Sequence, residues 1–293
     1  MVVENRSNER GFVVVTGTST GIGAATVSRL ANKGFHVFAG VRREEDAEAT
    51  RRVANGAVTP LMIDITDPAM VDAAARTVEQ AVAERGLAGL VNNAGIVKPG
   101  PLEFQPLDDF RRQLEVNLIG PLAVSQAFLP LIRRGRGRIV NVGSIGGLLV
   151  VPIQGAYSAS KFGLEAVSDA LRLELRQWKI PVAHVDPGVT DTPIFGKTLG
   201  ELDRALDALH ERGHDEYDAQ FAAVKKVVEK SPESAAPPED LAKAIAEALT
   251  AEKPKTRYHA GHGSKEAFVA ARTLTDRAKD RIVAHEVGLP RPQ

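Results

Sequence analysis

The chain has 293 residues, and its 37 lysines and arginines balance its 37 aspartates and glutamates. This zero net charge argues against a basic nucleic-acid clamp and against a polybasic membrane binder. Hydrophobic residues make up 43% of the chain and charged residues 25%, as in ordinary globular proteins, so a packed core is expected. The chain has no cysteine, which excludes disulfides, thiolate metal sites and cysteine nucleophiles.

Residues 1–10 are polar and lack the apolar run of a secretory signal, so we expect them to form a flexible N-terminal tail. No uninterrupted run of about 18 apolar residues occurs, and no integral membrane span is therefore predicted. Both features favour a cytoplasmic protein. Length alone suggests two domains, at about 150 residues per domain, but the pattern of predicted elements indicates one.

Short runs of β-branched and apolar residues alternate with helical stretches. The expected strands cover residues 12–15, 36–39, 57–63, 89–91, 138–142, 181–185 and 257–260. The expected helices cover residues 21–33, 44–54, 68–85, 106–132 and 157–178. Strands this apolar, separated by helices, indicate a mostly parallel sheet that is buried on both faces. The predicted fold is a single doubly wound, Rossmann-type α/β domain over residues 11–293, with seven strands.

The segment over residues 194–238 interrupts this alternation before the last strand. Its apolar residues are spaced as on two amphipathic helices: Leu202, Leu206 and Leu209, then Tyr217, Phe221, Val224 and Val228. We expect a helical insertion that covers a substrate pocket. The alternative is a pair of ordinary surface helices that pack on the body of the fold.

A glycine-rich turn joins the first predicted strand to the first helix and reads Thr16-Gly17-Thr18-Ser19-Thr20-Gly21-Ile22-Gly23. Glycines at such a turn allow a sharp change of direction and let a diphosphate approach the backbone. The N-terminus of the helix then offers free N–H groups to the anion. The spacing Gly-x-x-x-Gly-x-Gly differs from the Gly-x-Gly-x-x-Gly of many dehydrogenases, and a tight connection without a ligand is the alternative.

The residues after the second and third strands bear on which dinucleotide would bind. Val41 stands where a carboxylate would accept hydrogen bonds from an adenosine ribose, and Arg42 and Arg43 follow it. A guanidinium suits a 2′-phosphate, so NADP(H) is favoured, while NAD(H) stays possible. A solvated arginine pair before an acidic helix is the alternative. Asp64, with Ile65 beside it, either accepts from an adenine amino group or only begins a turn.

Tyr157 and Lys161 are four residues apart at the start of a predicted helix, so one helix face carries both side chains. A free tyrosine has a pKa of about 10, and a nearby positive charge stabilises the phenolate. Lys161 supplies that charge, which would let Tyr157 exchange protons with an alcohol. Taken alone, such a pair is usually structural or solvated.

Two further polar residues are candidates for the same site. Ser144 follows the fifth strand, at the edge where ligands bind in an open α/β sheet, and its hydroxyl could hold a substrate carbonyl or alkoxide. Asn117 is a polar residue inside an apolar helical stretch, for which a hydrogen-bonded core amide is the alternative.

In their order and spacing these residues resemble the short-chain dehydrogenase/reductase family over nearly the whole chain. The motifs that carry the resemblance are Thr16-Gly17-x-x-x-Gly21-Ile22-Gly23, Asn92-Asn93-Ala94-Gly95, Asn117, Ser144, Tyr157-x-x-x-Lys161 and Pro187-Gly188. The resemblance implies an oxidoreductase that transfers hydride between a nicotinamide dinucleotide and an alcohol or carbonyl substrate. It also implies a homodimer or homotetramer built through the helices over residues 106–132 and 155–178.

The resemblance implies roles for individual residues. Tyr157 would be the general acid/base, Lys161 would lower its pKa and bind the nicotinamide ribose, and Ser144 would polarise the substrate oxygen. Asn117 would hold a water that connects Lys161 to solvent. The remaining expected cofactor contacts are Gly17, Ser19, Thr20, Gly21, Ile22, Gly23, Arg42, Asp64, Ile65, Asn93, Ala94, Gly95, Pro187, Gly188, Val189 and Thr192. Thr20 departs from the basic residue that some NADP-dependent members carry.

Residues 37–40, 100–104 and 140–147 are similar to the retinol and hydroxysteroid dehydrogenase branch of that family. This similarity implies a bulky, apolar, steroid-, retinoid- or lipid-like substrate. An apolar pocket for it would be lined by Leu148, Ile153, Ile194, Phe195 and Leu199, which would suit plain core packing equally.

Two alternative functions and one excluded site complete the expectations. A 3-oxoacyl-type reductase would use the same chemistry, and a non-catalytic dinucleotide-binding sensor would use the same fold without a proton relay. His259 and His262 are close in sequence, but no further ligands cluster near them, so no metal is expected.

Overall fold

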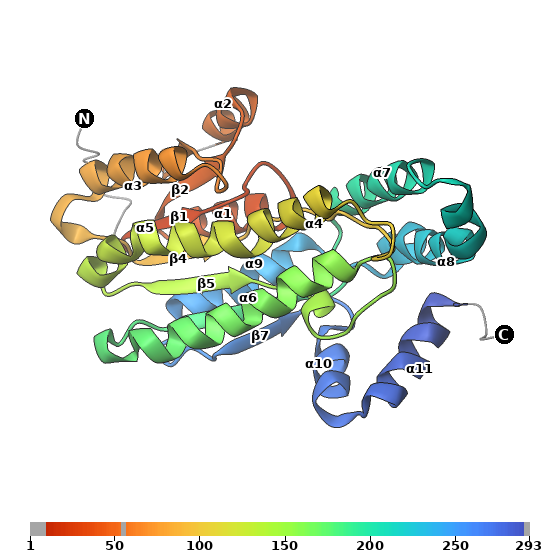
Figure 1. Cartoon of the computed structure of the whole chain (residues 1–293). Coiled ribbons are helices and arrows are strands. Elements are labelled where there is room, and N and C mark those ends of the chain that lie inside the picture. Colours follow the sequence, from red (N-terminus) through yellow and green to blue (C-terminus); the bar gives the residue numbers. More distant parts are fainter. Residues whose placement is uncertain (1–9, 54–56, 290–293) are drawn as a thin grey trace.

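The computed structural model describes residues 10–53 and 57–289, so the expected tail lies, apart from Arg10, outside the described residues. Seven strands form one sheet in the order β3-β2-β1-β4-β5-β6-β7, and every neighbouring pair is parallel (Figure 1). The strands are β1 (Phe12–Val15), β2 (His36–Val41), β3 (Val58–Met62), β4 (Gly89–Asn92), β5 (Arg138–Val142), β6 (Val182–Pro187) and β7 (Arg257–Ala260). The predicted seven-stranded, doubly wound fold is confirmed.

Helices cover both faces of the sheet, because its strands are apolar on both sides. One face packs against α3 (Pro68–Val82), α4 (Leu107–Leu114), α5 (Gly120–Gly135) and α6 (Gly155–Glu174). The other packs against α1 (Gly21–Asn32) and α9 (Pro238–Thr250). Helix α2 (Glu44–Val53) joins β2 to the edge strand β3. Each face therefore has its own apolar core.

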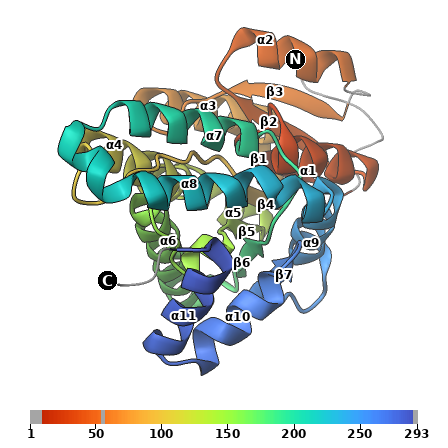
Figure 2. The same cartoon turned by 90° about the vertical axis from the view of Figure 1, so that its right-hand side faces the viewer.

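The strand order reverses between β1 and β4, which creates a crevice at the carboxyl ends of these strands. Ligands of open parallel sheets bind in such a crevice. The glycine turn after β1 and the segments after β4, β5 and β6 all meet at this edge, which faces the viewer in Figure 2. The topology thus brings together motifs that are up to about 170 residues apart in the chain, as a parallel sheet does.

The helix expected over residues 106–132 is continuous over Leu107–Gly135 but contains a π-helical turn over Glu115–Ile119. By length and composition this helix could cross a membrane, because an 18-residue window in it has a mean hydropathy of 1.3. Scattered polar residues hide it from a search for uninterrupted apolar runs. Half of that window is buried inside the fold, where it packs against the sheet and α6, as a core helix does.

The predicted insertion forms α7 (Ile194–Asp207) and α8 (Glu211–Ser234), which lie beyond the carboxyl ends of the strands (Figures 1 and 2). They share a third apolar cluster with Ile153 and with Val287 of α11 (Asp276–Val287). Helices α10 (Ser264–Thr273) and α11 were not predicted, because their sequences are short, largely polar and more than half exposed.

Candidate active site

The glycine turn packs directly against the segment after β4, and its glycines are required for this approach. A Cβ at Gly17, where φ is +68°, would lie 2.7 Å from the Cα of Ala94. A Cβ at Gly23 would lie 2.2 Å from the carbonyl oxygen of Gly17. No larger residue fits at either position without moving backbone, so the turn presents a bare peptide surface.

Asn93 fastens the two segments together. Its side-chain amide donates to the carbonyl oxygens of Thr16 at 3.0 Å and of Gly17 at 2.9 Å. The Thr16 hydroxyl in turn accepts from the backbone N–H groups of Asn93 and Ala94 at 3.0 and 3.1 Å. Asn93 and Ala94 were predicted as site residues, whereas Thr16 was given no role. The position of Thr16 directly before the first glycine of the turn was the signal that could have indicated its role.

The start of α1 is open to a ligand. Thr20 is the N-cap residue, yet within the described chain its side chain makes no hydrogen bond to the helix. Ser19 and Thr20 are both exposed, and Ile22 is half-buried behind them. The first N–H groups of a helix attract an anion when no side chain caps them. The turn therefore fits the diphosphate of a dinucleotide.

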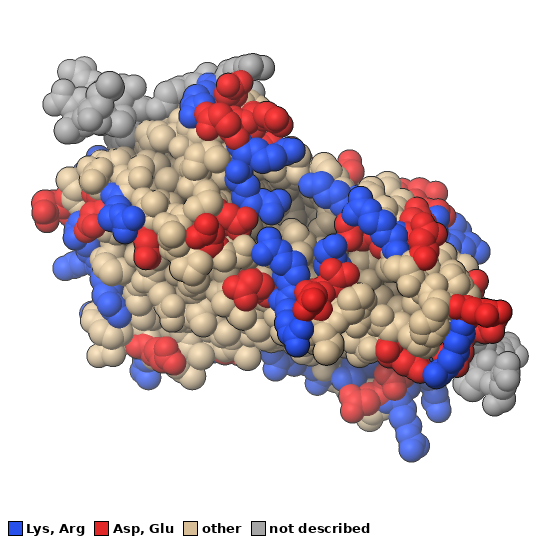
Figure 3. All heavy atoms as spheres, turned by 45° about the horizontal axis from the view of Figure 1, so that its top comes forward, with Lys and Arg blue, Asp and Glu red and all other residues tan. Residues whose placement is uncertain are grey.

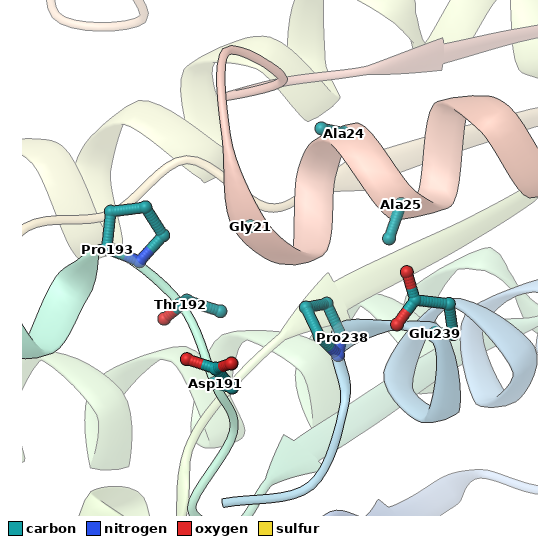
Figure 4. A pocket seen from close by; sticks show the side chains of 8 residues that line it. All are labelled: Gly21, Ala24, Ala25, Asp191, Thr192, Pro193, Pro238 and Glu239. Carbon is teal, nitrogen blue, oxygen red and sulfur yellow. The ribbon is translucent and has the colours of Figure 1, made fainter. Parts of the chain in front are cut away.

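A pocket of about 550 Å³ opens beside this helix start (Figure 4). Two expected cofactor contacts line it, Gly21 and Thr192. A Cβ at Gly21 would lie 3.0 Å from the Thr192 side chain, so the glycine keeps this passage open. Sequence analysis missed the other lining residues, which are Ala24, Ala25, Asp191, Pro193, Pro238 and Glu239. Small residues on the first turns of α1 were the signal for Ala24 and Ala25.

The segment after β6 completes this side of the site. Pro187 is buried at the strand end, and Gly188 and Val189 follow it half-exposed. A Cβ at Gly188 would lie 2.0 Å from the carbonyl oxygen of His262, which accepts from Val189 N at 3.0 Å. Pairing with the segment after β7 therefore fixes the backbone that leads to Thr192.

The two arginines after β2 differ in their surroundings. Arg43 pairs with Asp46 at 3.0 Å, whereas no ion pair within 4 Å involves Arg42 in the described residues. Arg42 is exposed and lies near Asp64, together with Arg112 of α4. Figure 3 shows lysine and arginine side chains bordering a hollow on this side of the molecule. Arg42 thus carries a free positive charge beside the crevice, and Arg112 was missed by sequence analysis.

Asp64 holds the turn after β3. Its carboxylate accepts from the backbone N–H of Thr66 at 2.9 Å and from the Thr66 hydroxyl at 2.7 Å. Burial alone would raise the pKa of Asp64, but these hydrogen bonds and the charges of Arg42 and Arg112 lower it below its usual range. Ile65 beside it is buried against Gly120. Asp64 is therefore an ionised acceptor at the rim of the crevice.

Tyr157, Lys161 and Ser144 come together at the end of β5. Tyr157 and Lys161 occupy successive turns of α6, and the lysine Nζ lies 5.9 Å from the tyrosine ring centre. The Ser144 hydroxyl accepts from Gly146 N at 3.0 Å and lies close enough to Tyr157 to act on its ionisation. A Cβ at Gly146 would lie 2.8 Å from the tyrosine ring, so this glycine admits the phenol. The hydroxyl groups of Ser144 and Tyr157 therefore lie together at the end of β5.

Burial acts on both titratable groups of this set. It raises the pKa of Tyr157, and the hydrogen bond from Ser144 opposes that rise. It lowers the pKa of Lys161 to about 8, and the charge of Asp186 opposes that fall. Lys161 is 5% exposed and donates to the carbonyl oxygen of Val142 at 2.9 Å. Burial therefore shifts the two pKa values in opposite directions, and that of Lys161 falls below that of Tyr157.

Asn117 lies in the π-helical turn and is fully buried. Its side-chain oxygen accepts from Ile96 N at 2.9 Å, and its amide donates to Ile96 O and to Ser160 Oγ at 3.0 and 3.1 Å. A Cβ at Gly95 would lie 3.5 Å from Asn117 Oδ1 and 3.8 Å from Lys161 Nζ. Asn117 is therefore a core amide whose hydrogen-bonding groups are satisfied. It also lies close to Lys161, so its place in the core and its expected place beside the lysine are compatible.

The residues expected to line an apolar pocket are only partly grouped. Leu148 and Ile153 are buried on the loop that leads to Tyr157. Phe195 and Leu199 of α7 pack against the cluster that contains Ile153, whereas Ile194 is 36% exposed. Apolar side chains of the insertion therefore face the approach to Tyr157.

One group of side chains in the described chain has metal-ligand chemistry: Glu165, His184 and Asp186, whose ligand atoms lie within 4.8 Å of one another. Sequence analysis did not single them out, because they lie on different elements. The guanidinium of Arg257 donates to Glu165 at 2.8 Å and would compete with a cation for that carboxylate.

Comparison with known proteins agrees with this geometry. Residues 11–202 match the family described as short chain dehydrogenase. The chain is 36% identical over 289 residues to retinol dehydrogenase 5 of Homo sapiens, covering 96% of this chain and 89% of that protein. It is 33% identical over 276 residues to the NADPH-dependent 3-dehydrocapnine reductase of Ornithobacterium rhinotracheale, covering 92% and 95%.

Solved structures show the same similarity. A short-chain dehydrogenase from Streptomyces avermitilis aligns with a TM-score of 0.75 and 26% identity, covering 95% of this chain and 97% of that one. A short chain dehydrogenase from Burkholderia cenocepacia in complex with NADP aligns with a TM-score of 0.69 and 25% identity, covering 95% and 98%.

Gly23→Ala should weaken NADPH binding by about tenfold or more, the equivalent of about 1.4 kcal/mol, because its Cβ would meet Gly17 O and distort the turn. Titration of the intrinsic fluorescence with NADPH measures this. Gly196→Ala is the matched control: nothing lies within 4 Å of its Cβ, and it should leave binding unchanged. Equal affinities for the two variants would show that the turn does not hold the dinucleotide.

Proposed function

The chain belongs to the short-chain dehydrogenase/reductase family, and from this premise we propose that it is an NADP(H)-preferring enzyme that interconverts a bulky, apolar alcohol and its carbonyl compound. The observation that carries the proposal is the placement of Tyr157, Lys161 and Ser144 beside a glycine turn that fits a dinucleotide. The curated relatives support the reaction class, since they are named as a dehydrogenase and a reductase of organic substrates.

The chain's own residues perform the proton transfer. Ser144 orients the substrate oxygen by hydrogen bonding, and Tyr157 gives a proton to that oxygen in reduction or takes it in oxidation. Lys161 stabilises the phenolate of Tyr157 by its charge and binds the nicotinamide ribose. Asn117 connects Lys161 to solvent through a water. A bound nicotinamide supplies or accepts the hydride.

The rest of the cradle binds the cofactor. Gly17 and Gly23 let the diphosphate approach the backbone, and the uncapped start of α1 attracts its charge. Asp64 would hold the adenine, and Gly188 and Thr192 would hold the nicotinamide. The close approaches at Gly17 and Gly23 support the part of this assignment that concerns the diphosphate.

The preference for NADP(H) rests on Arg42. Its guanidinium is exposed beside Asp64, while the neighbouring Arg43 is held by Asp46. A free guanidinium can bind the adenosine 2′-phosphate through charge-assisted hydrogen bonds. The NADP-bound structural neighbour and the NADPH-dependent relative support this choice. NAD(H) would bind the same cradle with lower affinity.

The substrate class rests on the insertion over residues 194–238. Phe195 and Leu199 of α7 lie in the same apolar cluster as Ile153, four residues before Tyr157. An alcohol or carbonyl that reaches Tyr157 would bury its body against these side chains. The relative named retinol dehydrogenase 5 supports a lipid-like substrate over a 3-oxoacyl one.

A homodimer or homotetramer is part of the same proposal. Helix α6 exposes Phe162, and the π-helical turn exposes Ile119, at 44% and 48%. Apolar side chains on the helices expected to pair support assembly through this face.

Tyr157→Phe should lower kcat by about 10²- to 10⁴-fold, because it removes the proton donor, and should leave NADPH affinity unchanged. Steady-state kinetics and fluorescence titration measure the two quantities. Tyr217→Phe is the control, since that hydroxyl donates to Glu103 at 3.1 Å on the rim of the insertion. Turnover retained by Tyr157→Phe would contradict the mechanism, and a wild type without turnover on any carbonyl would favour a sensor.

Arg42→Ala should weaken NADPH binding relative to NADH by roughly 10- to 100-fold, since hydrogen bonds to charged groups contribute about 1.5–3 kcal/mol. Parallel titrations with the two cofactors measure the ratio. Arg43→Ala removes the same charge from the adjacent residue and should leave the ratio unchanged. If both variants bind the cofactors like the wild type, neither arginine selects NADP(H).

A homologous series of methyl ketones tests the substrate class. Because each buried methylene contributes about 0.8 kcal/mol, kcat/KM with NADPH should rise by up to about fourfold per added methylene. A soluble 3-oxoacyl thioester, assayed in parallel, is expected to react more slowly than the longest ketone. No dependence on chain length, or faster turnover of the thioester, would overturn the apolar-pocket assignment.

A further inference from the structure

The end of β6 carries a buried imidazole and a buried carboxylate that the proposed mechanism does not use. His184 is 2% exposed and Asp186 is 0% exposed. Asp186 Oδ1 lies 3.2 Å from His184 Nε2, and Oδ2 lies 3.5 Å from His259 Nδ1 on β7. Neither carboxylate oxygen accepts a hydrogen bond from the described residues. A buried carboxylate without donors requires compensation by nearby charge.

Gly143 provides the space for this pair. A Cβ at Gly143 would lie 2.1 Å from His184 Nε2 and 2.8 Å from Asp186 Oδ1. The preceding residue, Val142, accepts from Lys161 Nζ at 2.9 Å. Two consecutive residues at the end of β5 are therefore in contact with these groups: Val142 with Lys161, and Gly143 with His184 and Asp186.

The charged and titratable groups packed around Asp186 come from four elements. Helix α6 contributes Lys161 and Glu165, β6 contributes His184, and β7 contributes His259 and Arg257. On α10, Lys265 acts on His259, whose pKa is lowered chiefly by burial. Arg257 is engaged by Glu165 and by Asp169 at 2.8 and 3.2 Å.

Lys161 is the cation of this group that belongs to the proposed catalytic set. No carboxylate of the described chain lies within 4 Å of its Nζ, so Asp186 acts on it through space. Such an interaction is strong where water is excluded, because the effective dielectric constant is low. His184 is fixed on its other side, where its Nδ1 hydrogen-bonds with Ser168 Oγ at 2.9 Å. The imidazole is therefore fixed between Ser168 and the carboxylate of Asp186.

We propose that Asp186 is a positioning residue: the buried counter-ion, seated by His184 in the space left by Gly143, that keeps Lys161 protonated while Lys161 acts on Tyr157. The proposal rests on the proposed function, because it acts through that lysine. A divalent cation at Glu165, His184 and Asp186 is the competing explanation of the unpartnered oxygens. The hydrogen bond from Arg257 to Glu165 favours the counter-ion.

The sign of the effect follows from the environment. Burial lowers the pKa of Lys161 to about 8, and the negative charge of Asp186 limits that fall. The ammonium form is present below this pKa and is lost as the pH rises through it. Removing the charge of Asp186 should therefore make Lys161 lose its proton at lower pH, and the alkaline limb of kcat/KM for carbonyl reduction should move in the same direction.

The test is Asp186→Asn, which preserves shape and removes the charge. The pH dependence of reductive methylation of Lys161, followed by mass spectrometry in the cofactor-free protein, should move by about one pH unit to lower pH, as for the loss of a nearby opposite charge. The alkaline limb of kcat/KM should move with it. Asp186→Ser, which is smaller and cannot collide with His184, repeats the charge removal if the asparagine variant does not fold.

Asp169→Asn is the matched control. It removes the same charge from a carboxylate that is partly exposed and bound by Arg172 and Arg257, and both pH profiles should stay unchanged. Unshifted profiles in both Asp186 variants, or a uniform loss of activity at every pH, would overturn the proposal. So would stoichiometric zinc or manganese in the purified protein whose removal shifts the profile. The methylation profile stands apart from turnover, so it separates failure of this proposal from failure of the proposed function.

Discussion

A lysine ammonium that is 5% exposed, at the end of a central strand, is the constraint on which the site depends. An ammonium withdrawn from water loses solvation, so the fold must supply partners or the group loses its proton. Val142 offers one carbonyl oxygen at 2.9 Å, and Gly95 leaves the space beside the Nζ clear. The rest of the compensation comes from charge at a distance. In the proposed mechanism, the charge of Lys161 at this position therefore controls the ionisation of Tyr157.

The parallel sheet makes this arrangement possible. Every strand ends at the same edge, so the turn after β1 and the segments after β4, β5 and β6 converge there. Close approach of these backbones is allowed by glycines, as at Gly23 against Gly17 and at Gly188 against His262. The bare peptide surface that results fits a diphosphate, and in the proposed mechanism the side chains of α6 provide the chemistry. Binding and proton transfer thus use different elements that share one edge.

Features with local signals could be predicted from the sequence. Apolar runs located the seven strands, and the spacing of Tyr157 and Lys161 placed both side chains on one helix face. Features that depend on pairing between distant segments could not be predicted from the sequence. The approach of Asp186 to His259 follows from the register of β6 on β7, and α10 and α11 lack a strong apolar period. The π-helical turn at Asn117 likewise has no period of its own to detect.

The central claim is that the charge of Lys161 sets the ionisation of Tyr157. The most direct measurement is the ultraviolet difference titration of tyrosinate with NADP⁺ bound, in a Tyr217→Phe, Tyr258→Phe background that leaves Tyr157 as the sole tyrosine. The account predicts a higher pKa of Tyr157 in the isosteric but uncharged Lys161→Met variant than in the same background with Lys161. Superimposable titrations of the two proteins would contradict it.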